Sequence, residues 1–309
     1  MSLPAAYLLG KIEDGVTIYI QTPDGWALDP GHAALLQSGL YGCRQGGNRW
    51  AVKRTSTLRS LGAYPSPADP SLYIKTGDNK SFVLVSTVVD DFLMTGWPES
   101  YLQSFKSALF QKLAMTGGDE AQWFINLTIT RDRKRRTLML DQSKYAETVL
   151  RDFGMSDCRA ARTPAPEGQV LSKSMCPVTE IEKAKAAMVP YQSILGKLLY
   201  FRITRPDIMQ IVSKLASYAS CWGMAHWKAA KYVLRYIKGT KNFGLLFTSA
   251  GKSLTEPWIL EMYVDSDYAT DVDTCRSRAG CLPNLPQWKP NIIPQLFATR
   301  QSRFGHRHL

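Results

Sequence analysis

The chain has 309 residues, of which 45% are hydrophobic, and a formal net charge of +12. Its pI is near 9.4. This composition excludes a disordered protein, and the length predicts about two domains. The positive charge favours polyanionic partners, nucleic acid before an anionic membrane. No segment approaches the roughly 20 uninterrupted apolar residues of a membrane span, and residues 1–7 lack the features of a signal peptide. We therefore expect a soluble intracellular protein with no membrane partner.

Residues 1 to about 96 are predicted to be rich in strands and to end in a hairpin. Asp90 and Asp91 lie between the apolar run 82–89 and a shorter apolar run at 92–94. Neighbouring side chains of a strand point to opposite faces, so adjacent carboxylates converge on one cation only where the chain reverses. Hard cations such as Mg²⁺ take oxygen ligands, and a pair of them can clamp the oxygens of a phosphoryl transfer. The pattern indicates polymerase-like chemistry; a solvated turn is the alternative.

Beyond Gly96, apolar residues recur at helical spacing, which predicts an amphipathic helix that begins near Pro98 and packs on the preceding sheet. Two strands, a short helix capped near Gly154 and a proline-rich linker are expected next. They lie at 123–129, 137–140, 145–154 and 159–190. Three further helical patterns follow, at 194–199, 208–215 and 226–238.

Two groups of cationic side chains are candidates for binding nucleic acid. The basic run 131–136, which includes Arg133 and Arg135, is predicted to form a hairpin turn. On the helix at 226–238 a cationic stripe lies about 100° from an apolar one, and its members are Lys228, Lys231, Arg235 and Lys238. Such a ridge can follow a phosphate backbone. An ordinary amphipathic helix with a solvated basic side is the alternative.

A second acidic cluster follows the apolar run at 261–264 and comprises Asp265, Asp267, Asp271 and Asp273. An EF-hand is excluded, because Thr270 and Arg276 stand where the loop needs glycine and glutamate. A phosphatase nucleophile and a ribonuclease H site are the remaining alternatives. No aspartate or glutamate follows Asp273, so no later side chain can complete a metal centre. Prolines make residues 282 onward poor strand material.

Cysteine spacing gives no sign of a metal site. The six cysteines contain no Cys-x-x-Cys pair and no regular framework; they lie at 43, 158, 176, 221, 275 and 281. Zinc is therefore not expected, and free thiols in a reducing compartment are predicted.

Taken in order, eight blocks of the chain resemble the polymerase region of a copia-type retrotransposon Pol polyprotein. Residues 40–45 (LYGCRQ) resemble the family's Leu-Tyr-Gly-Leu-Lys-Gln block, and residues 88–91 (VVDD) stand where the family has Tyr-Val-Asp-Asp. The other blocks lie at 68–73, 140–145, 153–158, 204–208, 225–240 and 263–269. Together they cover almost the whole chain.

The resemblance implies an α+β fold. Its expected parts are a right-hand polymerase palm of antiparallel sheet and helices, a helical thumb or connection, and a truncated ribonuclease H-like α/β segment. The implied domains are an N-terminally truncated fingers and palm region with the start of the thumb, a linker, the helical thumb or connection, and an incomplete ribonuclease H-like segment with a disordered tail. Their ranges are 1–158, 159–190, 191–258 and 259–309.

The resemblance also implies a function. The activity would be RNA-directed DNA polymerisation by two-metal nucleotidyl transfer, with an RNA template, a DNA primer and product, and deoxynucleoside triphosphates as partners. Asp90 and Asp91 would be the catalytic ligands of Mg²⁺ or Mn²⁺, Gln45 a nucleotide-binding residue, and Asp265 a vestigial ribonuclease H ligand. The protein would act inside the cell, in a cytoplasmic virus-like particle or in the nucleus. The sequence does not indicate an oligomeric state.

Three departures from the family pattern bear on activity. Ser2 stands in place of the first metal aspartate, Val88 in place of the tyrosine before Val-Asp-Asp, and Asn126 in place of the glycine in the strand that resembles the primer grip. A neutral hydroxyl cannot supply the charge that holds two divalent cations against a triphosphate, so we expect two-metal catalysis to be severely impaired. The alternative is a non-catalytic remnant that only binds nucleic acid.

Overall fold

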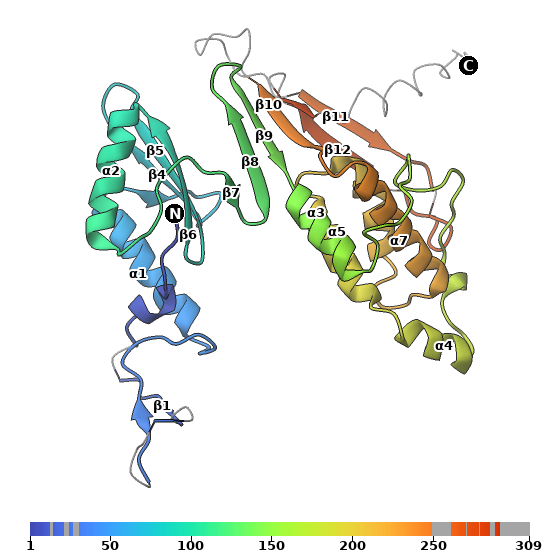
Figure 1. Cartoon of the computed structure of the whole chain (residues 1–309), viewed down its shortest axis with the longest axis horizontal. Coiled ribbons are helices and arrows are strands. Elements are labelled where there is room, and N and C mark those ends of the chain that lie inside the picture. Colours follow the sequence, from blue (N-terminus) through green and yellow to red (C-terminus); the bar gives the residue numbers. More distant parts are fainter. Residues whose placement is uncertain are drawn as a thin grey trace. The chain divides into compact units, whose positions relative to one another are not determined.

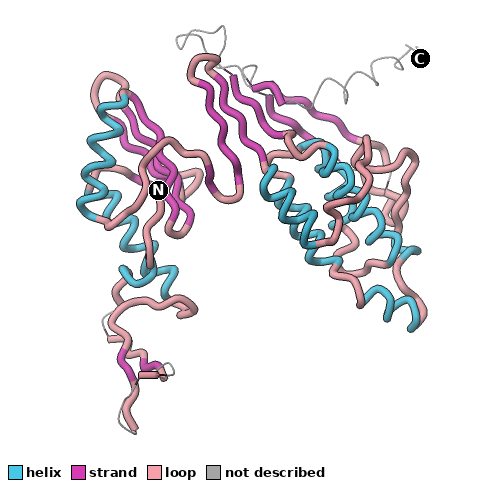
Figure 2. Tube along the Cα trace, in the orientation of Figure 1, coloured by secondary structure: helices cyan, strands magenta, loops and turns pink. Residues whose placement is uncertain are grey.

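The structure is a computed structural model that describes residues 1–12, 15–21, 25–26, 31–248, 261–269, 271–277, 279–284 and 288–290. The chain divides into two compact units, Met1–Ile125 and Asn126–Leu309, which are described separately (Figures 1 and 2). The expected mixture of helices and antiparallel sheet is confirmed. Among the described helices, none is long and apolar enough to cross a membrane.

The first unit contains a four-stranded antiparallel sheet in the order β3-β4-β5-β6. The strands are β3 (Tyr64–Pro65), β4 (Leu72–Thr76), β5 (Phe82–Val88) and β6 (Asp91–Trp97). Burial alternates along β5, where Val83, Val85 and Thr87 are buried and their neighbours are not, because successive side chains point to opposite faces. One face of the sheet therefore packs on the core.

Two helices pack against this sheet (Figure 1). They are α1 (Gly46–Ser60) and α2 (Glu99–Lys112). The helix predicted from Pro98 onward is confirmed as α2, and its Phe105 and Leu109 reach the core together with Trp50 of α1. The remaining short elements of the unit are η1 (Ala6–Leu9), β1 (Tyr19–Ile20), β2 (Ala34–Leu35) and β7 (Trp123–Phe124).

The strand predicted over 123–129 is interrupted after β7. Ile125 and Asn126 have φ values of 43° and 56°, and two successive left-handed residues cannot continue a strand. The chain resumes as β8 (Leu127–Asp132). Asparagine is one of the few residues besides glycine that adopts this conformation readily, so Asn126 can stand where the resembled block has glycine.

The second unit combines a sheet with a helical core. Strands β8, β9 (Thr137–Asp141), β10 (Gly244–Thr248) and β13 (Trp288–Pro290) lie in the order β13-β10-β9-β8. Helices α3 (Ser143–Asp152), α5 (Tyr191–Phe201), α6 (Met209–Ala216) and α7 (Met224–Gly239) share one hydrophobic core and gather beside the sheet in Figure 2. The short helix and the three later helical patterns are thus confirmed.

A buried ion pair lies in the segment before α6, and its arginine also bonds to the residue that follows α7. The guanidinium of Arg205, which precedes η3 (Pro206–Ile208), donates to both carboxylate oxygens of Asp207 at 3.0 and 2.7 Å. It also donates to the carbonyl and hydroxyl oxygens of Thr240 at 3.0 and 2.6 Å. Both charged side chains are 2% exposed, so their charges are compensated inside the core.

The expected linker at 159–190 contains two ordered elements, η2 (Lys173–Met175) and α4 (Glu180–Ala187). Helix α4 begins with a capping box, in which the Thr179 hydroxyl accepts from the Glu182 backbone and the Glu182 carboxylate accepts from the Thr179 backbone. The predicted boundary at 158 falls inside the second unit. The assignment into domains stays a prediction, and the boundary at 258 lies outside the described residues. Of the tail that was expected to be disordered, 282–309, only 282–284 and 288–290 are described.

The expectation that residues 282 onward cannot form strands is wrong for the described part. Strand β11 (Glu261–Ser266) pairs with β12 (Ala279–Asn284), where Pro283 lies opposite Met262. Pro290 ends β13, which pairs with β10. Both proline-containing strands are sheet edges among the described residues. An edge strand tolerates proline, because one side of its backbone has no strand to bond.

The prediction of free thiols is wrong for one pair. Cys176 and Cys221 form a disulfide with a Cα–Cα distance of 5.8 Å, while Cys43, Cys158, Cys275 and Cys281 are free. The bond links the end of η2 to the segment between α6 and α7. Those two segments come together only through packing of the helical core, so the spacing of cysteines along the sequence could not reveal the pair.

Candidate functional site

The two adjacent aspartates lie at the reversal between β5 and β6. Val88 pairs with Asp91, so Val89 and Asp90 form a two-residue turn and Asp91 is the first residue of β6. Both aspartates are partly exposed. The predicted hairpin is confirmed, with Asp90 in the turn and Asp91 beside it. Two carboxylates therefore lie at one end of the sheet, accessible to solvent.

The first residues of the chain pair with β6 through an isolated antiparallel bridge. The backbone N–H of Phe92 donates to the Met1 carbonyl at 2.8 Å, and the N–H of Leu3 donates to the Asp90 carbonyl at 2.9 Å. Ser2 is the residue between them and pairs with Asp91 in an antiparallel bridge. In this type of pair the Cα atoms lie about 4.5 Å apart and the two side chains share a face. The side chains of Ser2 and Asp91 therefore project from the same face.

Thr116 pairs with Ser2 on the side opposite β6. Ser2 and Thr116 exchange two backbone hydrogen bonds, of 3.1 and 2.9 Å. Leu3 and Ala6, which follow, are buried in the core of the unit at 1% and 0% exposure. The backbone position of Ser2 is therefore fixed from both sides, independently of its side chain.

Helix α1 contacts the turn through Trp50. The indole Nε1–H of Trp50 donates to the carbonyl of Val89 at 2.6 Å, and the side chain is 1% exposed. A Cβ on Gly10 would lie 2.8 Å from the backbone nitrogen of Trp50, so only glycine permits this approach of the N-terminal segment. Gln45, the predicted nucleotide-binding residue, is exposed just before α1 begins. The structure thus connects the helix that carries Gln45 with the Asp90 turn.

The carboxylates of Asp90 and Asp91 are oxygen ligands of the kind that a divalent cation takes. Magnesium commonly binds one or two protein carboxylates and takes its other ligands from water and substrate phosphates, so Asp90 and Asp91 fit a single divalent cation. Among the described residues, no group of three His, Cys, Asp or Glu side chains could hold a metal ion. Ser2 is the position where a third carboxylate would share the face of Asp91.

The cationic stripe of α7 divides into two parts. Arg235 donates from Nε to the carbonyl of Arg159 at 2.8 Å, and Lys238 donates from Nζ to the carbonyl of Cys158 at 2.6 Å. Lys228 is exposed, and Lys231 is partly exposed with its ammonium 5.9 Å from the centre of the Trp227 ring. Two of the four cations thus hold a neighbouring segment.

The neighbouring segment, residues 158–162, carries two further cationic side chains that the sequence pattern did not indicate. Residues 158–161 lie along α7, since the Ala161 N–H also donates to the Arg235 carbonyl at 3.1 Å. Arg159 and Arg162 are exposed there. Neither belongs to a periodic pattern, so only the tertiary contact indicates that they extend the cationic surface of α7. We call the exposed cations Lys228, Lys231, Arg159 and Arg162 the α7 surface.

The basic hairpin turn does not join this surface. Asp132 pairs with Thr137, which confirms the hairpin and leaves Arg133 and Arg135 exposed in its turn. Asp132 accepts from the Arg135 backbone at 2.9 Å. Strand β10, which follows α7, starts opposite Asp141, at the end of β9 away from this turn. The two groups of cations therefore lie at opposite ends of the sheet.

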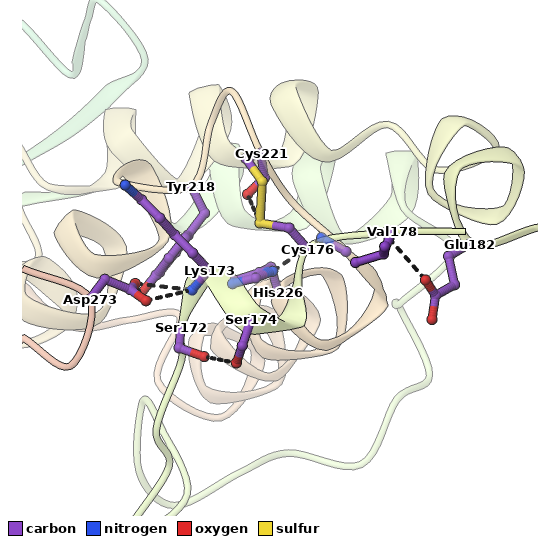
Figure 3. Close-up of a disulfide and its surroundings, with 11 residues drawn as sticks. Ser172, Lys173, Ser174, Cys176, Val178, Glu182, Tyr218, Cys221, His226 and Asp273 are labelled. Carbon is purple, nitrogen blue, oxygen red and sulfur yellow. Dashed lines mark hydrogen bonds between the residues drawn. A yellow bond between two sulfur atoms is a disulfide. The ribbon is translucent and has the colours of Figure 1, made fainter. Parts of the chain in front are cut away.

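The second acidic cluster is spread over a strand and a loop. Asp265 is exposed in β11, opposite Gly280. Asp273 accepts from the Lys173 backbone at 2.9 and 3.0 Å and from the Tyr218 hydroxyl at 3.0 Å (Figure 3). Asp271 accepts from the backbone of Asp273 and Thr274 at 3.2 and 3.0 Å. Asp271 and Asp273 thus stabilise loop structure instead of converging with Asp265 on a cation.

A buried histidine lies between this loop and the disulfide. Figure 3 shows His226 close to Tyr218, Asp273 and the Cys176–Cys221 bond. Burial lowers the pKa of His226, and a hydrogen bond to the Ser172 backbone and the charge of Asp273 act in the opposite direction. The neutral imidazole accepts from the Gly223 backbone through Nδ1 at 3.1 Å. This arrangement organises the start of α7, which presents part of the cationic surface.

The sequence of the chain is similar to known proteins. A family model described as reverse transcriptase (RNA-dependent DNA polymerase) matches residues 1–167. Similar proteins include the retrovirus-related Pol polyproteins from transposon TNT 1-94 of Nicotiana tabacum, 33% identical over 285 residues, and from transposons RE1 and RE2 of Arabidopsis thaliana, each 30% identical. Each match covers 91% of this chain, but the chain spans only 21% of the first relative and 18% of the other two. No solved structure matches.

Proposed function

The chain belongs to the reverse transcriptase (RNA-dependent DNA polymerase) family, and from that premise we propose that Asp90 and Asp91 bind Mg²⁺ or Mn²⁺ at a polymerase site. The observation that carries the proposal is the bridge between Ser2 and Asp91. It brings the block that resembles the family's first metal block beside the Asp-Asp hairpin, although the two are far apart in sequence. A solvated turn would not require this pairing.

The proposed reaction is attack of a primer 3′-hydroxyl on the α-phosphate of a deoxynucleoside triphosphate, directed by an RNA template. The metal would lower the pKa of the hydroxyl and neutralise the charge of the leaving pyrophosphate. Asp90 and Asp91 would hold the cation, and Gln45, at the start of α1, would contact the incoming nucleotide. Ser2 contributes no charge, so this chain would catalyse the reaction poorly.

In this proposal the other parts of the chain have supporting roles. The region 1–158 would form the palm with the remaining fingers and the start of the thumb, and helices α5 to α7 would form the thumb or connection. Strands β11 and β12 would be the opening of a ribonuclease H-like segment, with Asp265 as a vestigial ligand. As in the family, the protein would act in a cytoplasmic virus-like particle or in the nucleus.

Primer extension on an RNA template tests the polymerase proposal directly. We expect Mg²⁺- or Mn²⁺-dependent incorporation that Asp90→Asn lowers by at least about 100-fold, because the variant removes a charge that stabilises the transition state. Asp78→Asn is the matched control, since Asp78 is an exposed aspartate at the other end of β5. Incorporation in the parent that equals background, or that survives Asp90→Asn, would contradict catalysis at this hairpin.

Binding of nucleic acid without catalysis is the second candidate function, and the α7 surface is the observation that favours it. Phosphate contacts release counterions, so affinity should fall steeply with salt. We expect the double variant Lys228→Ala/Lys231→Ala to weaken binding of an RNA–DNA hybrid and to lower the slope of log affinity against log salt by about 1.8. Fluorescence anisotropy at several KCl concentrations measures both quantities.

Two controls distinguish binding at the α7 surface from a general effect of the protein's positive charge. Lys185→Ala removes an exposed lysine from α4 and should leave the salt slope unchanged. Arg159→Ala should weaken binding in the same way as the double variant, whereas Asp90→Asn should not change it. Equal losses from Lys185→Ala and from the α7 variants, or binding that does not depend on salt, would remove this candidate.

A further inference from the structure

Trp50 links helix α1 to the turn that carries Asp90. We propose that Trp50 is a positioning residue, whose indole N–H holds the turn so that Asp90 and Asp91 converge on one cation. The inference rests on the proposed function, since it assumes a metal at the hairpin. In this proposal Trp50 touches neither metal nor substrate. It acts through the carbonyl of Val89, which lies 2.6 Å from the Trp50 Nε1 atom.

The turn needs such a restraint because of its first residue. Val89 has a φ of 52°, a conformation that β-branched side chains rarely adopt. Hairpins with this geometry at the first central position usually have glycine there. A valine in this position stores strain, and strained residues persist only where the surrounding structure fixes them. Without an external bond, the turn would relax and move Asp90.

The turn is fixed by two bonds from outside the hairpin. Trp50 donates to the Val89 carbonyl, and the Leu3 backbone donates to the Asp90 carbonyl at 2.9 Å. Trp50 and Leu3 are each 1% exposed and belong to the same hydrophobic core. The rigid core therefore defines where the turn lies, and Trp50 is the only side chain of the described residues that makes such a bond to it.

The carboxylates themselves receive little orientation from other side chains. Within the described residues, no side chain hydrogen-bonds to the carboxylate of Asp90 or Asp91. Their directions are consequently set by the backbone of the turn and of β6. A shift of that backbone changes the ligand geometry directly, and divalent cations of the Mg²⁺ class tolerate such changes poorly.

Binding of Mn²⁺ to the full chain, followed by electron paramagnetic resonance, tests the role of Trp50. We expect Trp50→Phe to weaken Mn²⁺ binding about tenfold, as loss of an outer partner of a metal site does. Tyr73→Phe is the matched control. It removes a hydrogen-bonding group from another aromatic side chain of the same core, where the hydroxyls of Tyr73 and Thr55 share a hydrogen bond of 2.7 Å and the Tyr73 side chain is 1% exposed. This control should lower thermal stability similarly but leave Mn²⁺ binding unchanged.

A rescue variant distinguishes positioning from general stability. Glycine adopts a positive φ without steric cost, so Val89→Gly should restore most of the Mn²⁺ affinity that Trp50→Phe loses. A purely structural role for Trp50 predicts no such recovery. If Trp50→Phe does not fold, the analogue benzothienylalanine at position 50 removes only the N–H and keeps the shape of the ring, and the same loss and rescue are expected.

The outcomes separate the two proposals. Parent-like Mn²⁺ affinity in Trp50→Phe, together with loss of binding in Asp90→Asn, would overturn the role of Trp50 while supporting the metal site. Parent-like affinity in Asp90→Asn would contradict the metal site itself, and with it the role of Trp50. Equal losses from Trp50→Phe and Tyr73→Phe would also overturn the role of Trp50, because general destabilisation would then explain both.

Discussion

Replacement of Ser2 by aspartate should raise metal-dependent primer extension by about 100-fold or more over the parent chain, the size of effect seen when one well-placed transition-state contact is gained or lost. Ser2→Asp places a third carboxylate on the face that carries Asp91, because the two residues form a directly opposed antiparallel pair. Primer extension measured with Mg²⁺ and with Mn²⁺ gives the result. The affinity tag belongs at the C-terminus, since the amino group and carbonyl of Met1 both bond to Phe92.

The same variant should show a second, independent effect. Three clustered carboxylates repel one another, so without a metal Ser2→Asp should lower the melting temperature of the first unit. A divalent cation that binds the folded state restores that stability by mass action, and the stabilisation by Mn²⁺ should therefore be larger in Ser2→Asp than in the parent. Thermal unfolding with and without Mn²⁺ measures this difference.

Ser2→Asn is the matched control, because it has the shape of aspartate without its charge. It should leave primer extension and the response to Mn²⁺ at the level of the parent. If Ser2→Asp performs no better than Ser2→Asn in both assays, the absent carboxylate at position 2 does not limit the site, and the explanation for impaired catalysis would be wrong.

Removal of Arg205 should cost the second unit about 3–5 kcal/mol of unfolding free energy, because it leaves the buried carboxylate of Asp207 without a partner. Arg205→Ala also removes the two donors to Thr240 and the guanidinium that lies 5.5 Å from the centres of the Tyr236 and Phe243 rings. Burial, with Asp207 adding to the effect, raises the pKa of Tyr236 to about 12, so the nearby phenol stays neutral and does not compensate the Asp207 carboxylate. Urea unfolding followed by circular dichroism measures the loss.

Two further variants test whether the loss of stability comes from the burial of the ion pair. Lys183→Ala breaks an exposed ion pair with Glu180 of 2.8 Å and should cost little, since water screens such pairs. Arg205→Met combined with Asp207→Leu should recover much of the loss, because it removes both charges together. A loss in Arg205→Ala no larger than that in Lys183→Ala would mean that the ion pair does not hold η3 to the end of α7.

Local patterns were enough to predict most elements of the fold. Apolar spacing predicted α2, α3, α5, α6 and α7, and the apolar run before Asp90 predicted the hairpin. Where the predicted elements are wrong, the feature that determines the structure lies outside the local sequence pattern. Pro283 is accepted in β12 because that strand is an edge, and Ile125 and Asn126 interrupt a strand through φ values that no periodicity reveals.

The sequence indicates which residues are candidate ligands, but not which residues hold them in place. Asp90 and Asp91 were proposed from residue type and order, and Ser2 was singled out through the resemblance to the family. The bond from Trp50 to Val89 joins residues 39 apart, and the bond from Lys238 to Cys158 joins residues 80 apart. The latter gives a structural contact to Lys238, whose binding to nucleic acid stays a prediction. Such contacts arise from tertiary packing, which spacing along the chain does not encode.

The segment Met1–Leu3 also determines the order in which the site assembles. Its bonds to Phe92 and Thr116 close loops of 91 and 114 residues, whereas β5 and β6 are joined by a two-residue turn. Closing a long loop costs more chain entropy, and distant contacts form slowly. We therefore expect the hairpin to form early and the N-terminal segment to dock after it. Ser2 would therefore reach its place beside Asp91 only after the hairpin that carries Asp91 has formed.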